Sequence, residues 1–445
     1  MKYAVLTFGC RVNQADSLEC EADLLARGAT PAPVEDADVV IVNTCSVTAS
    51  ADQSARQAIR RVARVNSTVK IVVTGCYATR APDEVAGLPQ VLRVLPNPYK
   101  PRLVELVDEE LGLSTARRFD DGEGSCGASV EPGVAGRTAY TLRAQSGCRE
   151  TCAYCIIPST RGAPVSRPVA EVCAQLLDAA ALGFKEVALT GVHLGSYGRD
   201  LSPSASVMGL LESLERVAPP DVRIRISSLE PMDCSANVVD LIAASDVFAP
   251  HFHLPLQHAS DRMLDSMRRG YSVATYAALV DRIRRRLPEA SIGTDLIVGF
   301  PGEREADVEE LLAYLALSPL THAHVFPYSD RPGTRASALQ PKVVGPAIRE
   351  RARLVREVAS DLAATFHRVQ VGRVHRSLTL EDGTLALTGN YLKVRIPPGR
   401  MRNEWVDVHV TRASGALEGE VVARPSATTS SLPLLTTSRH VCDGP

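Results

Sequence analysis

The first hundred residues alternate between short apolar runs and longer amphipathic stretches. Apolar residues fill 3–8, 39–42 and 70–74, and each run has the length of a buried strand. Between these runs, 14–27 and 50–65 repeat their apolar residues at helical spacing and carry charged faces. Strands that alternate with helices are typical of a parallel sheet covered by helices, so the pattern predicts an α/β domain.

The same alternation returns after a segment rich in turn-forming residues. Residues 113–136 include Asp121-Gly122-Glu123-Gly124-Ser125 and Glu131-Pro132-Gly133, a composition that predicts a linker. Beyond it we expect six strands, at 138–144, 185–190, 222–227, 250–256, 291–298 and 322–327. We expect helices at 168–182, 235–245, 272–286 and 305–317, and a further helix near 345–369. Repeats of strand and helix in this number predict a closed or partial (β/α) barrel.

The last part of the chain changes character. Residues 370–424 place Val, Thr and Leu in short alternating runs separated by turn signals, which predicts a small all-β barrel module. Residues 425–445 are rich in Ser and Thr and are predicted to be disordered. The predicted domains are therefore 1–112 (α/β), 113–136 (linker), 137–369 (barrel and following helix), 370–424 (β module) and 425–445 (tail).

Composition limits the class of protein. A chain of 445 residues with 45% hydrophobic content suggests two or three domains with cores of ordinary size. No stretch reaches the roughly 18 apolar residues of a membrane span, and the start does not resemble a secretory signal, so we expect a cytoplasmic protein without a membrane partner. The net charge of −2, with local Arg clusters, permits RNA as a partner without demanding it. Eleven cysteines in a reducing compartment favour metal or redox chemistry over disulfides.

Three of the cysteines stand close together in the sequence. Cys148, Cys152 and Cys155 follow a Cys-x3-Cys-x2-Cys spacing. Three thiolates can hold three irons of a cubic iron–sulfur cluster and leave the fourth iron open to a ligand that is not protein. A zinc site would normally close with a fourth Cys or a His, and neither follows at short spacing. A structural zinc knuckle and three unrelated core cysteines are the alternatives.

Three further cysteines, Cys10, Cys45 and Cys76, each come just after one of the predicted N-terminal strands. Loops at the carboxyl ends of neighbouring parallel strands converge on one crevice, so we expect these thiols to meet in space. A Gly precedes two of them, which is consistent with close backbone approach. Three buried core cysteines are the alternative. The absence of a G-x-G-x-x-G run weakens a dinucleotide-binding interpretation of this sheet.

The spacing that begins at Cys148 resembles the signature of the radical S-adenosylmethionine enzymes, in which the open iron binds S-adenosylmethionine. Two three-cysteine sites, an α/β domain, a barrel and a β module in this order resemble the methylthiotransferase family over nearly the whole chain. The β module is similar to the TRAM domain, which holds RNA in this family. Further segments that look like family signatures are Leu189-Thr190-Gly191-Val192, Leu254-Pro255-Leu256-Gln257, Met267-Arg268-Arg269-Gly270-Tyr271, Thr294-Asp295-Leu296-Ile297-Val298-Gly299-Phe300-Pro301-Gly302-Glu303 and Tyr328-Ser329-Asp330-Arg331-Pro332-Gly333-Thr334.

The loop around Cys10 distinguishes branches of this family. Gly9-Cys10-Arg11-Val12-Asn13-Gln14 is similar to the Gly-Cys-Lys-Val-Asn-Gln of the branch that modifies threonylcarbamoyladenosine in tRNA. Enzymes for isopentenylated adenosine carry Gly-Cys-Gln-Met-Asn, and those that act on a ribosomal protein carry Gly-Cys-Pro-Lys-Asn. The chain departs from the pattern at Arg11, which replaces Lys, and at Gln257-His258-Ala259-Ser260, where the family usually has Gln-Ser-Gly-Ser.

The resemblance implies two 4Fe–4S clusters and S-adenosylmethionine as cofactors. One cluster would be bound by Cys148, Cys152 and Cys155 together with S-adenosylmethionine, and an auxiliary cluster by Cys10, Cys45 and Cys76. Two weaker candidates for cofactor contact lie at strand ends. Gly191 would let the backbone approach the methionine end of S-adenosylmethionine, and Glu230 would bind its amine or ribose, unless Glu230 only caps the next helix. His193 and Arg161 also fall near such loops and receive no role.

The implied reaction is methylthiolation of carbon 2 of N6-threonylcarbamoyladenosine at position 37 of tRNA. Its partners would be tRNAs that read codons beginning with A, an electron donor such as flavodoxin or ferredoxin, and a sulfur source. The alternatives are the same chemistry on isopentenyladenosine or on a ribosomal protein side chain. A protein of another class, an iron–sulfur RNA-binding or redox protein without catalysis, is the most distant alternative.

Overall fold

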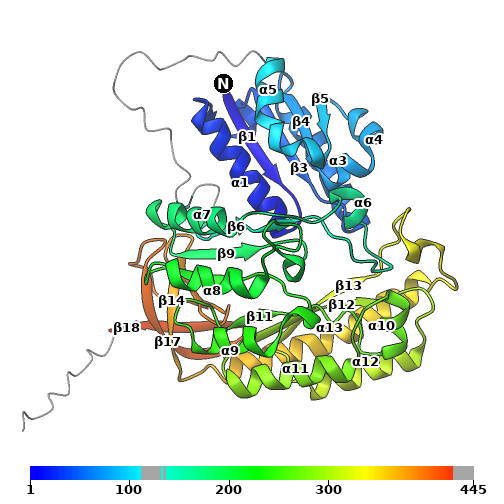
Figure 1. The fold of residues 1–445 in the computed structure, drawn as a ribbon, viewed down its shortest axis with the longest axis vertical. Coiled ribbons are helices and arrows are strands. Elements are labelled where there is room, and N and C mark those ends of the chain that lie inside the picture. Colours follow the sequence, from blue (N-terminus) through cyan, green and yellow to red (C-terminus); the bar gives the residue numbers. More distant parts are fainter. Residues whose placement is uncertain (112–131, 134–136, 424–445) are drawn as a thin grey trace, which may run out of the picture.

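The structure, a computed structural model, describes residues 1–111, 132–133 and 137–423. The predicted linker, apart from residues 132 and 133, and the predicted tail at 425–445 lie outside the described residues. An N-terminal α/β domain, a central barrel and a C-terminal β-barrel follow one another along the chain (Figure 1). The fold class predicted from the hydrophobic pattern is confirmed.

A five-stranded parallel sheet forms the N-terminal domain. Its strands are β1 (Lys2–Thr7), β2 (Thr30–Pro31), β3 (Val39–Thr44), β4 (Lys70–Gly75) and β5 (Val91–Leu95), in the order β2-β1-β3-β4-β5. Its helices are α1 (Arg11–Ala26), α2 (Ala49–Val65), α3 (Cys76–Arg80), α4 (Pro82–Ala86) and α5 (Leu103–Leu111). The three predicted strands and both predicted helices are present. The edge strands β2 and β5 were not predicted, because β2 has two residues and β5 is only half-buried.

The central strand β3 is buried on both faces. Val39 and Ile41 pack with Leu18 of α1, whereas Val40 and Val42 pack with the helix α2 on the other side of the sheet. A strand covered on both faces has no polar positions, which is why 39–42 is an unbroken apolar run. The helices thus hold β1, β3 and β4 side by side, and the carboxyl ends of these three strands meet at one edge.

The central domain is a six-stranded partial barrel. Its strands are β6 (Tyr140–Arg143), β9 (Glu186–Thr190), β10 (Arg223–Ile226), β11 (His251–His253), β12 (Ser291–Val298) and β13 (His322–Pro327), so all six predicted strands are present. They form two parallel sheets, β10-β9-β6 and β11-β12-β13. The Ala249 N–H donates to the carbonyl of Ile224 at 2.8 Å, which joins the two sheets between β10 and β11.

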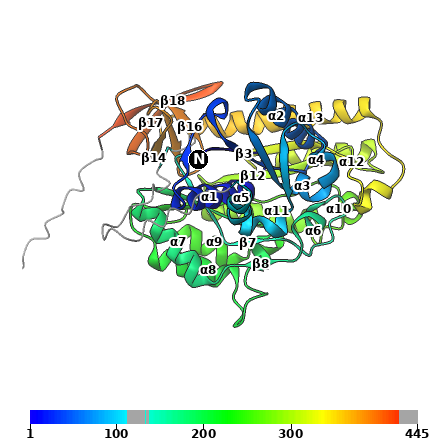
Figure 2. The same ribbon diagram turned by 90° about the horizontal axis from the view of Figure 1, so that it is seen from above.

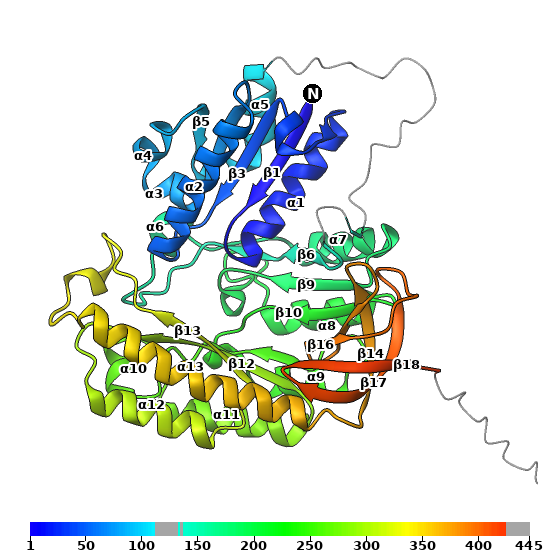
Figure 3. The ribbon, with the colours of Figure 1, turned by 180° about the vertical axis from the view of Figure 1, so that it is seen from behind.

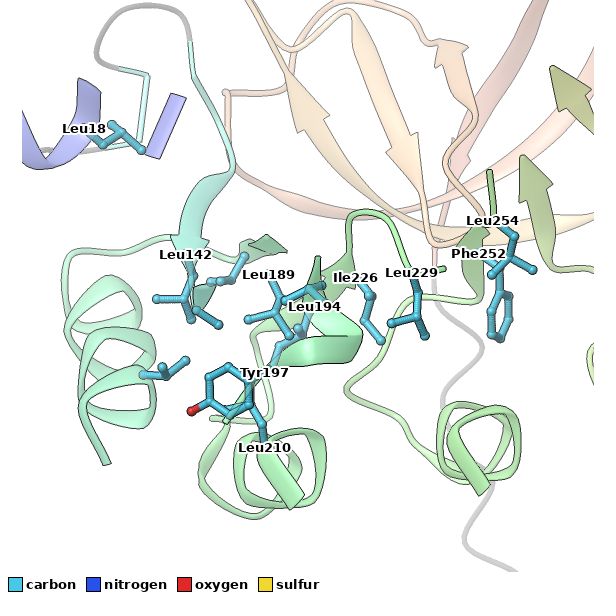
Figure 4. Close-up of a cluster of buried hydrophobic side chains, with 14 of the residues drawn as sticks. Leu18, Leu142, Leu189, Leu194, Tyr197, Leu210, Ile226, Leu229, Phe252 and Leu254 are labelled. Carbon is cyan, nitrogen blue, oxygen red and sulfur yellow. The ribbon is translucent and has the colours of Figure 1, made fainter. Parts of the chain in front are cut away.

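Helices cover the outer face of this barrel. They are α7 (Val169–Ala181), α8 (Val207–Val217), α9 (Ala236–Ala244), α10 (Asp261–Met267), α11 (Val273–Arg286) and α12 (Glu305–Leu317), and α13 (Gly345–Arg368) leads out of the barrel. The five helices predicted for this region are present, and α8 and α10 are additions. Leu142 and Leu189 of the strands point toward Tyr197 and toward Leu210 of α8, and Leu18 of α1 joins the same core (Figure 4). The N-terminal domain is therefore packed on the barrel through a continuous apolar core.

The C-terminal module is a closed five-stranded barrel. It consists of β14 (Val374–Leu380), β15 (Leu385–Thr388), β16 (Lys393–Arg395), β17 (Trp405–Ser414) and β18 (Ala416–Val422), in the order β14-β15-β16-β18-β17. Val394, Val408 and Leu417 fill its interior. It lies beside the amino-terminal ends of the central strands, at the end of the molecule away from α10 (Figures 2 and 3).

Two buried arginines fasten this module to the central barrel. Arg223 and Arg225 of β10 both pair with Glu186 of β9, at 2.9 and 3.0 Å. Their guanidinium groups also donate to the carbonyl oxygens of Leu387 and Gly389 in the module, at 3.0 and 2.9 Å. Although burial alone would raise it, the pKa of Glu186 is lowered to about 2 by these two arginines. The charged Glu186 carboxylate thus orients both guanidinium groups toward the module.

No helix within the described part of the chain combines the length and apolarity needed to cross a membrane.

Candidate metal centre

The first cysteine set lies where the sequence predicted it, at the carboxyl edge of the N-terminal sheet. Cys10 precedes α1, Cys45 directly follows β3, and Cys76 is the first residue of α3 after β4. Because β1, β3 and β4 are neighbours in the sheet, the three loops leave it side by side. Their thiols are close enough to interact electrostatically, since Cys10 and Cys76 both act on Cys45.

Glycines and one asparagine bring these loops together. Gly9 has φ +90°, and a Cβ on it would lie 2.5 Å from the Cys45 Sγ. Gly75 has φ +98°, and its Cβ would lie 2.2 Å from the carbonyl oxygen of Thr44. The Asn13 amide donates to the carbonyl oxygens of Phe8 and Thr44, at 2.8 and 2.9 Å. The Asn of the Gly-Cys-Arg-Val-Asn run therefore ties the first cysteine loop to the second.

The second set lies in the loop after β6 and β7 (Gln145–Ser146), ahead of α6 (Ile157–Arg161). The Cys148 N–H donates to the carbonyl of Gly162 at 3.0 Å, and the Cys155 N–H donates to that of Cys152 at 3.2 Å. The Ala153 N–H donates to the carbonyl of Met267 at 2.9 Å, which anchors the middle of the loop. Backbone hydrogen bonds thus hold a loop that has little regular structure.

Hydrogen-bond donors point at the sulfur atoms of both sets. In the first set, the Val47 N–H donates to the Cys45 Sγ at 3.5 Å, and the Asn97 amide donates to the Cys76 Sγ at 3.6 Å. In the second set, the Glu150 N–H donates to the Cys148 Sγ and the Arg269 guanidinium donates to the Cys152 Sγ, both at 3.3 Å. Such donors stabilise cysteine in its thiolate form and set the properties of iron–sulfur clusters. Burial raises the pKa of the Cys45 and Cys155 thiols to about 12, so binding of a metal has to supply the free energy that deprotonates them.

The spacing of the sulfur atoms favours a cluster over a single ion. Among the described residues, neither cysteine set has its three sulfur atoms within 4.8 Å of one another, as one ion bound to all three would require. A cubic cluster spreads its cysteines further apart, because each sulfur binds a different iron. Neither set is therefore compact enough for a single ion held by all three of its cysteines, and a 4Fe–4S cluster on each set stays a prediction.

Arg161 connects the two cysteine sets. Its guanidinium donates to Ser146, two residues before Cys148, at 3.1 Å, and to Asn13 of the first set. It also pairs with Asp16 at 3.0 Å. Asn97 links the sets in the same way, because its amide contacts the Cys76 Sγ and the carbonyl of Thr160 beside Arg161. The two sites therefore face each other across the junction of the N-terminal domain and the barrel.

A cavity of about 640 Å³ lies at this junction. Asp16 and Lys100 line it from the N-terminal domain, and Arg143 and Arg161 line it from the barrel. Although burial alone would raise it, these three cations hold the pKa of Asp16 well below its usual range. Glu19, Asp23 and Arg167 line the cavity as well, so its wall carries four cations and three carboxylates and is close to neutral.

Gly191 and Glu230, the two residues predicted to contact the cofactor, both lie close to the second cysteine set. The Glu230 carboxylate pairs with Arg269, which also donates to Cys152. Glu230 is the N-cap residue of the short helix that follows, but its side chain makes no capping hydrogen bond there. A Cβ on Gly191 would meet Leu194 at 2.8 Å and the Gln145 amide oxygen at 3.2 Å, so this glycine allows close packing behind the cysteine loop. Contact of either residue with S-adenosylmethionine stays a prediction.

Sequence reasoning missed three functional candidates: Arg161, Arg269 and His193. His193 is buried beside Cys148, and its Nε2 lies 3.0 Å from Asp233 Oδ2. Although burial alone would lower it, the Asp233 carboxylate and the neighbouring Cys148 raise the pKa of His193 to about 10. The available signals were weak. Arg269 stands in the Met267–Tyr271 segment that resembles a family signature, and His193 and Arg161 lie near strand-end loops. Their partners lie 15 to 148 residues away, which no local pattern reveals.

The unusual loop at 257–260 is accounted for by packing. His258 is fully buried, its Nδ1 accepts from the Ser260 N–H at 3.1 Å, and its Nε2 lies 3.3 Å from Glu303 Oε1. Glu303 also pairs with Arg351 of α13 at 2.7 Å. The histidine therefore belongs to an internal polar network rather than to a cysteine site.

Family models match the two domains that carry the cysteines. Residues 2–95 match the uncharacterized protein family UPF0004, and residues 142–315 match the radical SAM superfamily. Among solved structures, the radical S-adenosylmethionine methyltransferase TsrM from Kitasatospora setae superposes with a TM-score of 0.53 at 16% identity, covering 75% of this chain and 76% of that one. At this identity the likeness shows the fold alone.

Curated relatives match nearly the whole chain. The threonylcarbamoyladenosine tRNA methylthiotransferase of Aquifex aeolicus is 37% identical over 412 residues, which cover 89% of this chain and 96% of the relative. The protein of that name from Bacillus subtilis is 32% identical, covering 87% and 88%. The tRNA-2-methylthio-N(6)-dimethylallyladenosine synthase of Anaeromyxobacter dehalogenans is 37% identical over a shorter match, covering 76% and 73%. With the domain order and the two cysteine sets, these matches show that the chain belongs to the radical S-adenosylmethionine methylthiotransferase family, on the branch of the threonylcarbamoyladenosine tRNA methylthiotransferases.

Proposed function

We propose that this enzyme methylthiolates carbon 2 of N6-threonylcarbamoyladenosine at position 37 of tRNA. One observation carries the proposal: two cysteine sets, on separate domains, face each other across a junction that Arg161 and Asn97 span. The relatives that match over most of the chain bear this activity in their names. The domain division at 1–112, 137–369 and 370–424 is part of the same proposal.

The substrate explains why two sets are present. The C–H bond at carbon 2 of adenine is neither acidic nor easily attacked, so acid–base groups of the chain cannot open it. Cys148, Cys152 and Cys155 would hold a cluster that supplies radical chemistry together with S-adenosylmethionine, and Cys10, Cys45 and Cys76 would hold a cluster whose open iron binds the sulfur to be transferred. Arg161, Asn13 and Asn97 fix the relative position of the two sets.

Arg11 is the residue that favours the threonylcarbamoyl substrate. It stands next to Cys10, is half-buried, and donates to the Tyr391 hydroxyl at 2.8 Å. A threonylcarbamoyl group ends in a carboxylate, whereas an isopentenyl group is apolar. A guanidinium at this position can bind the carboxylate in a charge-assisted hydrogen bond. The cation at residue 11 therefore supports the first substrate over the isopentenyladenosine alternative.

The C-terminal barrel offers a surface for the tRNA backbone. Lys393 and Arg395 lie on the exposed side of β16, two and four residues after exposed Tyr391. Neither has an ion-pair partner among the described residues. An aromatic ring beside unpaired cations suits a nucleic-acid strand. We therefore propose that the module binds tRNA, and that the enzyme works in the cytoplasm with a flavodoxin or ferredoxin as electron donor and a separate sulfur source.

Mass spectrometry of nucleosides tests the substrate. Reconstituted enzyme is given tRNA that carries threonylcarbamoyladenosine, tRNA that carries isopentenyladenosine, and ribosomal protein. We expect methylthiolation of the first alone, with Arg11→Gln losing most of the activity on it and Arg11→Lys keeping it. Preferred modification of isopentenyladenosine or of ribosomal protein would refute the proposed substrate. Release of deoxyadenosine without methylthiolation of any substrate would mean that the enzyme acts on another molecule.

A salt series tests the RNA surface. The Lys393→Ala/Arg395→Ala variant should bind tRNA more weakly and with a flatter dependence of affinity on salt, because two phosphate contacts are lost. The control is Arg282→Ala/Arg285→Ala on α11, which removes two exposed arginines from the helical layer. Equal affinities and slopes for the first variant and the wild type would show that this face of the barrel does not bind tRNA.

A further inference from the structure

Three histidines outside the cysteine sites gather on one face of the β11-β12-β13 sheet. In-register pairing places His253 of β11 beside Gly293 of β12, and Gly293 beside His322 of β13. His324 follows two residues later on β13 and so lies on the same face as His322. The neighbouring Ile292 points the other way, into the core against α11 and α12. The histidines therefore occupy the face of the sheet opposite to α11 and α12.

The three imidazoles are compact enough for one ion. One ring nitrogen from each of His253, His322 and His324 lies within 4.8 Å of the other two. The ring centroids are separated by 6.4 Å between His253 and His322, and by 5.7 Å for each of the other two pairs. Within the part of the chain that the structure describes, no other group of His, Cys, Asp and Glu is as compact.

Neighbouring groups hold the rings in place. Asp295 Oδ1 lies 3.1 Å from His253 Nε2, and the Thr321 hydroxyl lies 2.9 Å from His322 Nδ1. Gly293 makes room for the His322 ring, because a Cβ there would lie 2.2 Å from the His322 Nε2. Carboxylate and hydroxyl partners of this kind orient histidines that bind metals.

We propose that His253, His322 and His324 bind one divalent transition-metal ion of the zinc class, at a site separate from both cysteine sets. Three imidazoles match the ligand preference of such ions, whereas Ca²⁺ and Mg²⁺ select oxygen ligands. Three protein ligands leave a fourth coordination position, as in zinc sites that bind water or a substrate oxygen.

Zinc binding to the enzyme with both clusters in place tests the site. The reconstituted enzyme is equilibrated with Zn²⁺ and desalted, and zinc and iron per chain are then counted. We expect about one zinc per chain in the wild type, and loss of that zinc in His322→Gln/His324→Gln with iron unchanged. The zinc absorption-edge spectrum should show nitrogen and oxygen ligands only.

Matched variants distinguish the loss of a metal-binding side chain from the loss of the folded structure. His324→Gln alone should weaken zinc retention while leaving the unfolding temperature unchanged, because His324 is exposed. His409→Gln, a histidine of the C-terminal barrel, should retain zinc like the wild type. The proposal is overturned if the wild type retains no zinc, if the double variant retains as much as the wild type, or if the spectrum shows sulfur ligands, which would place the zinc on cysteines.

Discussion

At the scale of single residues, the two cysteine sets have separable tasks. The barrel set includes Cys152, whose Sγ accepts from Arg269, and the N-terminal set includes Cys76, whose Sγ accepts from Asn97. Each set lies in its own domain and has its own hydrogen-bond donors. Loss of one set should therefore leave the other intact.

The iron count tests this separation. Reconstituted wild-type enzyme should hold about eight irons, as two cubic clusters imply. Replacing Cys148, Cys152 and Cys155 by Ala should leave about four and abolish release of deoxyadenosine from S-adenosylmethionine. A triple variant that keeps the full iron content would show that these cysteines are not cluster ligands.

A single substitution in the N-terminal set should separate the cleavage of S-adenosylmethionine from the transfer of the methylthio group. Cys45→Ala should still cleave S-adenosylmethionine reductively but should transfer no methylthio group, because radical generation and sulfur supply are on different domains. Deoxyadenosine and methylthiolated nucleoside are measured in the same reaction. Continued methylthiolation would reduce this set to a structural role.

At the scale of elements, the strand ends position the first set. The turn after β4 passes so close to Thr44 that residue 75 has no room for a side chain. Gly28, in the turn after α1, also has a positive φ of +78°, but a Cβ there would meet nothing within 4 Å. Substitutions at these two glycines therefore distinguish the effect of backbone strain from the effect of a steric clash.

Gly75→Ala should therefore damage the enzyme more than Gly28→Ala. Both variants incur the strain of a positive φ, about 1–3 kcal/mol at most, but Gly75→Ala also pushes the Cys76 loop away from the Cys45 loop. We expect a lower unfolding temperature and loss of about half the bound iron for Gly75→Ala, with full iron content for Gly28→Ala. Iron content per chain and thermal unfolding are the measurements, and equal behaviour of the two variants would contradict the steric explanation.

At the scale of the whole molecule, the C-terminal barrel is held by buried charge. Glu186 is fully enclosed with Arg223 and Arg225, while Asp221 and Arg376 form an exposed pair at 3.4 Å in the same interface. Removing one partner of a buried ion pair costs about 3–5 kcal/mol, because the remaining charge is buried and unpaired. An exposed pair contributes roughly 0–1 kcal/mol.

Glu186→Gln should thus loosen the C-terminal barrel, and Asp221→Asn should not. Because the folded-state pKa of Glu186 is lowered to about 2 from 4.5, its contribution is complete above pH 4.5 and is lost as the pH falls toward 2. The difference in Tm between Glu186→Gln and wild type should therefore be constant at neutral pH and shrink under acid. Thermal unfolding over a pH series and limited proteolysis between the barrels provide the readouts. Equal Tm values at neutral pH would show that the ion pair contributes nothing net.

The sequence by itself determined the periodic parts of this protein. Buried strands such as β3 are continuous apolar runs, and helices such as α11 repeat apolar residues every three or four positions, so both are visible locally. Placing Cys10, Cys45 and Cys76 at strand ends was enough to predict that they converge, because the topology of a parallel sheet brings such ends together. The edge strands were missed because β2 has only two residues and β5 is only half-buried.

Only the tertiary structure decided how the sites are linked. Arg161 joins the two cysteine sets through contacts 15 and 148 residues away, and Arg269 reaches Cys152 across 117 residues. The histidine group needs His253 and His322 to meet across Gly293, a register that the sequence does not encode locally. Periodicity reports which face of an element is buried, whereas partners of single polar side chains depend on how the domains pack, and that packing exists only in three dimensions.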